Sequence, residues 1–158
     1  MKIQIRKGLS FGLTSSVITT LGLIIGLNAT THSRLVVIGG ILTIAVADSL
    51  SDALAMHISE ESENQHSDKQ IWAATFATMF SKAIFALIFL IPVLLFSLNT
   101  AIITSIVLGL VLLSVLSYFI AKKEKISRIK SILEHLTIAT IVIVATHYVG
   151  YFISSVIG

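Results

Sequence analysis

Apolar residues run along this chain in five long blocks that are separated by short polar links. The blocks lie at about residues 9–29, 35–58, 71–97, 101–121 and 131–156. Each is close to or above the roughly 20 residues that a helix needs to cross a bilayer. Apolar and polar residues do not alternate as they do in a strand, so helices rather than a barrel would satisfy the backbone in lipid. The pattern predicts an all-α integral membrane protein whose residues 1–158 form a single domain of five transmembrane helices.

The composition agrees with this fold class and removes several functions. Hydrophobic residues make up 55% of the 158 residues and charged residues 12%, with a mean hydropathy of +0.97, whereas a soluble domain is about 25% charged. The absence of cysteine excludes disulfides and thiolate metal sites. No nucleophile–base constellation, phosphate loop or H-E-x-x-H motif occurs in the sequence. We therefore expect no enzyme, no bound cofactor and no nucleic-acid partner.

The basic residues predict the orientation in the membrane. Only Arg34 lies on the side opposite to the main set, which comprises Lys2, Arg6, Lys7, Lys69, Lys122, Lys123, Lys125, Arg128 and Lys130. The positive-inside rule places the amino terminus in the cytoplasm and, after five spans, the carboxyl terminus outside. The first block is longer than the core of a signal peptide and no A-x-A-like site follows it, so we expect a retained helix. We expect a multi-pass protein of a prokaryotic cell membrane.

The second block carries acids inside otherwise apolar sequence. Asp48, Asp52, Met56 and Glu60 are each four residues apart, so on a helix they form one ribbon. At ~1.5 Å per residue, Asp52 would lie roughly 10 Å and Asp48 roughly 16 Å from the inner end near Ser59. A carboxylate at such depth costs at least ~2.5 kcal/mol and usually marks an ion path, a proton path or a buried pair.

The residue types on this ribbon suit a divalent metal ion. Carboxylates are hard oxygen ligands for Mg²⁺, Mn²⁺ and Fe²⁺, and imidazole and thioether groups favour softer transition metals. Thr19 could add a neutral oxygen, Met56 could instead only pack, and His57 could instead lie at the interface. The candidate metal ligands are Asp52, Asp48, Met56, His57, Glu60 and Ser15.

A basic residue lies inside the third block. Lys82 reaches a depth similar to that of Asp48, which predicts an ion pair or a switchable counter-charge between these two residues. Because one lysine is not expected to neutralise both acids, Asp52 becomes the better metal candidate. The acids that follow Ser59 are either simply solvated or concentrate cations at a cytoplasmic entrance.

The first block has small residues at helical spacing. Ser15, Thr19, Gly22 and Gly26 recur every three or four positions, and the last two form a G-x-x-x-G. Such a face allows two helices to approach closely. It predicts either ordinary packing within the chain or contact between the first helices of two protomers.

Four segments resemble helices of the vacuolar iron transporter family. FGLTSSVITTLGLIIGL resembles its first helix, GGILTIAVADSLSDALAMHIS its second, AATFATMFSKAIFALIFLIPVLL its third and SRIKSILEHLTIATIVIVATHYVG its closing helix. The resemblance implies a homodimer of five-helix protomers whose first two helices line a central path. It also implies export of Fe²⁺ or Mn²⁺ from the cytosol in exchange for protons.

This chain departs from the family pattern at the ligand positions. The family's first-helix aspartate aligns with Ser15, its second-helix methionine aligns with Asp52, and its long cytoplasmic insert is reduced to residues 60–70. The first hypothesis is proton-coupled efflux of Fe²⁺ or Mn²⁺ at a dimer interface. The alternatives are a non-transporting membrane scaffold or accessory protein with a degenerate site, and a transporter of another cation with Lys82 and Asp48 as coupling pair.

Overall fold

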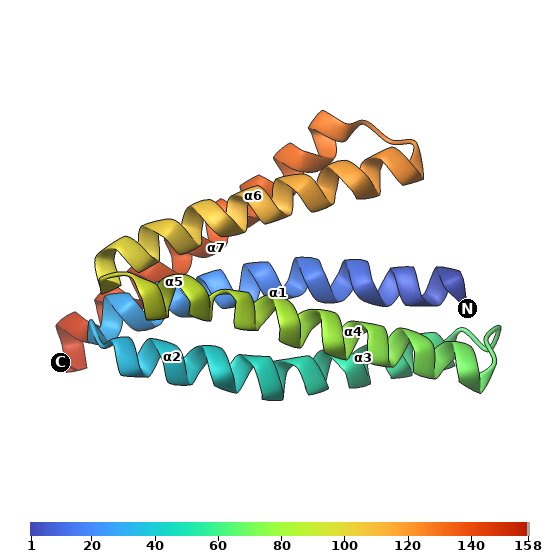
Figure 1. The fold of residues 1–158 in the computed structure, drawn as a ribbon, viewed down its shortest axis with the longest axis horizontal. Coiled ribbons are helices and arrows are strands. Elements are labelled where there is room, and N and C mark those ends of the chain that lie inside the picture. Colours follow the sequence, from blue (N-terminus) through green and yellow to red (C-terminus); the bar gives the residue numbers. More distant parts are fainter. Residues whose placement is uncertain (158) are drawn as a thin grey trace.

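The computed structural model describes residues 1–157, and these are almost entirely helical, with 91% of the chain in helices and no strand in the part described (Figure 1). Five helices are long and apolar enough to cross a membrane, which confirms the predicted fold class. They are α1 (Lys2–Thr31), the run Arg34–Ser62, the run Asp68–Leu95, α6 (Leu98–Glu124) and α7 (Arg128–Ile157).

The helices extend beyond the apolar blocks at their charged ends. The first helix begins at Lys2 instead of residue 9, and the last begins at Arg128 instead of residue 131. Hydropathy marks only the apolar part of a span, whereas lysine, arginine and glutamate are good helix formers and continue it. The turns have ordinary local causes: His32 takes a left-handed conformation with φ 49° after α1, and Ser67 opens the third helix with a capping box.

Two of the five spans are interrupted within the membrane. The second consists of α2 (Arg34–Thr43), the π-helical turn η1 (Ile44–Asp48) and α3 (Ser49–Ser62). The third consists of α4 (Asp68–Ile88) and α5 (Leu90–Leu95), separated at Phe89. Pro92 explains the second break, because it has no N–H to donate and its ring collides with the carbonyl of Ile88. The apolar pattern predicted both spans but gave no sign of these breaks within them.

Helix α1 lies at the centre of the bundle and contacts α2, α3, α4, α6 and α7. Glycines allow two of these contacts. A Cβ at Gly12 would lie 2.1 Å from Ser81 Oγ on α4, and one at Gly22 would lie 2.8 Å from Val142 Cγ1 on α7. Gly26 also faces α7. The Gly22–Gly26 face therefore packs against α7 within the chain, which is the first of the two alternatives that the sequence offered.

The two ends of the bundle differ in charge. The amino terminus, the α3–α4 link and the α6–α7 turn lie at one end, and the carboxyl terminus lies at the other (Figure 1). Arg6 donates to Glu124 at 3.0 Å and Lys7 donates to Glu63 at 2.8 Å at the basic end. The basic residues thus gather at one end as expected, and the placement of that end in the cytoplasm stays a prediction.

Candidate functional site

The π-helical turn lies halfway along the second span and ends at Asp48. The Ser49 hydroxyl, one residue beyond this turn, lies within hydrogen-bond distance of two carbonyl oxygens of the turn. They are those of Ala45, at 2.7 Å, and Val46, at 3.0 Å. Such turns are rare and occur often at functional sites. No glycine or proline marks this turn in the sequence, and the sequence analysis missed it.

The acidic ribbon faces α1, as its four-residue spacing predicted. Thr19 donates to Asp48 Oδ2 at 3.3 Å and Ser15 donates to Asp52 Oδ2 at 2.8 Å. Met56 is buried one turn further on, and Glu60 contacts the basic end of α1. Because α1 and α3 run antiparallel, successive turns of one meet successive turns of the other.

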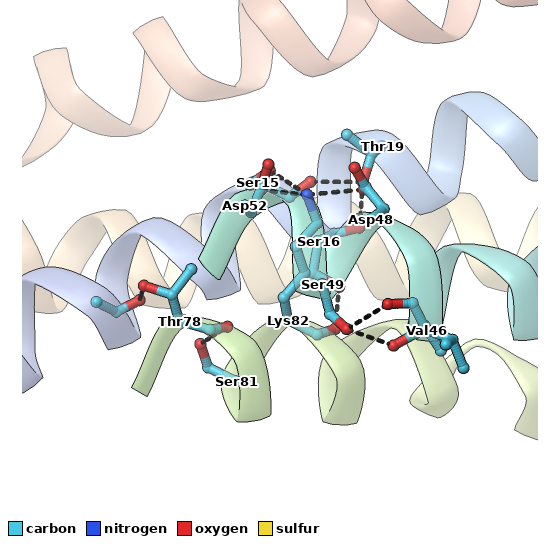
Figure 2. A network of polar contacts seen from close by, with 12 residues as sticks. Ser15, Ser16, Thr19, Val46, Asp48, Ser49, Asp52, Thr78, Ser81 and Lys82 are labelled. Carbon is cyan, nitrogen blue, oxygen red and sulfur yellow. Dashed lines mark hydrogen bonds and ion pairs between the residues drawn. The ribbon is translucent and has the colours of Figure 1, made fainter. Parts of the chain in front are cut away.

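Lys82 reaches the ribbon from α4, and its side chain is only 1% exposed. Its Nζ lies 2.7 Å from Asp48 Oδ2 and 2.9 Å from Ser15 Oγ, and it forms a short ion pair with Asp52 Oδ2 (Figure 2). The sequence argument assigned this lysine to Asp48 alone, which is wrong. The two carboxylates are one helical turn apart, so a single ammonium group with three N–H donors can reach both.

The backbone around Lys82 is fixed by close packing of α1 on α4. The Ser16 hydroxyl is buried and donates to the Lys82 carbonyl at 2.8 Å (Figure 2). Further towards the basic end, Thr78 donates to the Gly8 carbonyl at 3.3 Å. These contacts and the close approach at Gly12 hold the lysine in register with Ser15. The sequence analysis did not identify Ser16 or Thr78, because serine and threonine are common on membrane helices and their spacing here follows no motif.

With both carboxylates ionised and Lys82 protonated, the cluster carries one net negative charge. Lys82 offsets one of the two carboxylates, and Asp48 and Asp52 have side chains that are 32% and 20% exposed. A carboxylate at this depth cannot face lipid without a large cost. The open side of the cluster must therefore meet water, a cation or another protein surface.

Glu60 at the basic end of the ribbon is fully buried. Its carboxylate forms an ion pair with Lys7 Nζ at 2.5 Å and lies 3.1 Å from His66 Nδ1. Lys7 also binds Glu63, and this hydrogen bond and positive charge lower the pKa of the Glu63 carboxyl group. Glu60 is therefore neither a solvated loop acid nor an open ligand, because the link after α3 folds back and ties it to α1.

His57 lies away from the other predicted ligands. Its Nδ1 is 3.0 Å from Thr75 Oγ1, and its ring contacts Trp72 with centroids 4.6 Å apart. Both partners are on α4, on a different side of α3 from the carboxylates. Within residues 1–157 no three His, Asp or Glu side chains are arranged to hold a metal ion. One copy of the chain thus brings Asp48, Asp52, Ser15 and Thr19 together and leaves His57 apart.

The five spanning helices define the class of multi-pass membrane proteins. In this class, charged groups that are buried at mid-span mark ion and proton paths. Residues 52–151 match the model of the VIT family, the vacuolar iron transporter family. The match covers more than half of the chain, and the protein belongs to this family, whose members are associated with metal-ion transport across membranes. The matched part begins at Asp52, so α1 and Asp48 lie outside it. A search of curated proteins found no match.

Proposed function

We propose that the protein exports a divalent first-row metal ion, Fe²⁺ or Mn²⁺, from the cytosol in exchange for protons. The path runs between α1 and the second span, at the interface of a homodimer. The observation that carries this proposal is the partly open pair Asp48 and Asp52, which lies at mid-span and keeps one negative charge after pairing with Lys82. The family supports metal ions as cargo.

The donor atoms suit such a cargo. Asp48 and Asp52 offer carboxylate oxygens, and Ser15 and Thr19 offer hydroxyl oxygens on the facing helix. Oxygen ligands of this kind favour Mg²⁺, Mn²⁺ and Fe²⁺ over metals that prefer thiolates. Met56 is buried beside this path, and Glu60 is paired, so neither is needed as a ligand in this arrangement.

The charge of the site favours exchange between a metal ion and protons. Each copy keeps one uncompensated negative charge, so two copies that face each other keep two. One divalent cation or two protons can neutralise them, and a bound state of either kind avoids the cost of net charge in a low-dielectric environment. This competition is the physical requirement for exchange.

The second span offers a surface for the partner copy. Small, exposed residues recur on it at four-residue spacing, which keeps them on one side of a helix. They are Gly39, Thr43, Ala47, Ser51, Ala55 and Ser59. Small residues let membrane helices approach closely, and this stripe runs beside Asp48 and Asp52. We propose it as the dimer contact in place of the Gly22–Gly26 face.

The dimer contact is tested by two leucine substitutions. Ser51→Leu should dissociate the detergent-solubilised dimer in light scattering, whereas Gly22→Leu should lower the stability of each chain through its clash with α7. A Ser51→Leu protein that stays dimeric would rule out this contact.

The transport proposal is tested by metal flux into sealed proteoliposomes, with Fe²⁺ and Mn²⁺ outside and a pH dye inside. Asp52→Asn keeps the Lys82–Asp48 pair and should fold, but it should reduce flux at least tenfold. Glu61→Gln makes the same chemical change at an exposed acid and should keep most of the flux. If Asp52→Asn carries metal at the wild-type rate, Asp52 is structural and the proposed path is wrong.

One observation favours the scaffold alternative. Lys82 occupies both carboxylates, so the cluster could be a closed structural ion pair in a protein that no longer transports. In that case the wild-type chain gives no flux above that of empty vesicles for any of the metals, and Asp52→Asn changes only stability.

A further inference from the structure

Lys82 is a fixed part of the cluster. Its ammonium group donates hydrogen bonds to Asp52 Oδ2 and Ser15 Oγ and forms an ion pair with Asp48 Oδ2 at 2.7 Å (Figure 2). The side chain is 1% exposed, and Ser16 holds its backbone carbonyl at 2.8 Å. A lysine that is buried, paired and held in this way keeps its ammonium group against both carboxylates at mid-span.

The same geometry leaves one oxygen of each carboxylate open. Lys82, Ser15 and Thr19 all use the Oδ2 atoms, and in the described residues 1–157 no hydrogen bond reaches the Oδ1 atom of Asp48 or Asp52. Both side chains are partly exposed, at 32% and 20%. Each copy thus presents two carboxylate oxygens on the side away from its lysine.

We propose that Lys82 determines how many divalent ions the site accepts. This inference rests on the proposed function, in which two copies face each other. Without the lysines, the four carboxylates of the two copies would carry four negative charges. Two divalent ions would be needed to balance them. With both lysines in place, half of that charge is cancelled inside the protein. Because net charge is costly in a low-dielectric environment, the pair of copies then takes up one divalent ion.

The experiment counts bound Mn²⁺ on the full-length protein in detergent, with free Mn²⁺ measured by electron paramagnetic resonance. Wild-type protein should bind one Mn²⁺ per two chains, and Lys82→Gln should bind one per chain. Asp48→Asn makes each copy neutral and should weaken binding at least tenfold. The double variant Asp48→Asn with Lys82→Gln restores the single negative charge per copy and should return to one Mn²⁺ per two chains.

A matched control lies on the surface of α7. Lys130 and Glu134 form an exposed ion pair at 3.9 Å, and replacing either with Gln changes the net charge of the chain by the same amount without touching the site. Neither change should alter the number of bound ions. Such a control separates the local charge of the cluster from the charge of the whole protein.

The inference can be refuted even if Lys82→Gln fails to fold. Asp48→Asn keeps a neutral Lys82–Asp52 pair, so it should fold whether or not the variants that lack Lys82 do. If Asp48→Asn binds Mn²⁺ as tightly as wild-type protein, or if wild-type protein binds one ion per chain, Lys82 does not set the number of bound ions. A wild-type protein that follows the charge rule but gives no flux in vesicles would refute the proposed transport and leave the role of Lys82 intact.

Discussion

Removing the charge of Lys82 is the strongest perturbation that the cluster offers. Lys82→Met leaves Asp48 and Asp52 one turn apart without a counter-charge. Taking one partner from a buried ion pair costs about 3–5 kcal/mol, and we expect a loss of this size because the lysine is 1% exposed. Asp48→Asn leaves the lysine paired with Asp52 and should cost only about 1 kcal/mol. Neutralising all three residues together should bring the stability to within about 1 kcal/mol of wild type, because no unpaired charge remains.

The single tryptophan of the chain provides the assay. Trp72 is on α4 and packs against His57 of α3 and Phe76, with ring centroids 4.6 Å and 5.3 Å apart, so its emission reports separation of these helices. Unfolding by increasing sodium dodecyl sulfate in mixed micelles would be followed at this residue for each variant. If Lys82→Met is no less stable than Asp48→Asn, or if the triple variant is as unstable as Lys82→Met, the buried-charge explanation is wrong.

Two further predictions concern packing and pH. Gly12→Ala should cost about 1–3 kcal/mol of stability, since its Cβ would meet Ser81 Oγ at 2.1 Å and a backbone carbonyl at 2.7 Å. The control Gly26→Ala would meet only Thr146, at 3.5 Å or more, and should have no such cost. Equal unfolding midpoints for the two variants would contradict the close approach of α1 to α4. Lys7 lowers the pKa of Glu63 and so stabilises its ionised form in the folded protein. This contribution to the free energy of unfolding is fully present above the ordinary carboxyl pKa of about 4.3, and it is lost as the pH falls through the lowered pKa of the folded state. The stability difference between wild type and Glu63→Gln should therefore vanish in acid, and a difference that grows as the pH falls would reverse the assigned sign.

The five spans and the ribbon could be predicted because each depends on local spacing. Apolar runs of sufficient length identify spanning helices whatever their neighbours are, and residues four apart share a helix face in any packing. The position of Asp48, Asp52, Met56 and Glu60 towards α1 follows from this rule together with the cost of exposing acids to lipid.

The pairing within the cluster could not be predicted in the same way. Counting residues gives a depth for Lys82 but not the direction of its side chain, and depth alone favoured Asp48 over Asp52. The sequence also could not show which helix Gly22 packs against, because close packing on α7 and close packing on a second copy require the same small residues. Glu60 and His66 meet only because the α3–α4 link folds back, which no local pattern in the link encodes.

The interruptions in the second and third spans have a mechanical meaning. Bending in a helix concentrates where the regular hydrogen-bond ladder is broken, and here these places are the π-helical turn at Ile44–Asp48 and the break at Phe89. The outer segments α2 and α5 contact each other, and Arg34 donates to the Phe96 carbonyl at 2.5 Å just beyond α5. Beyond these breaks, α2 packs on the continuous helix α1 and α5 packs on the continuous helix α6. Asp48 is the last residue of the π-helical turn and Asp52 lies on α3, so a bend at this turn would change the separation of the two carboxylates of the cluster.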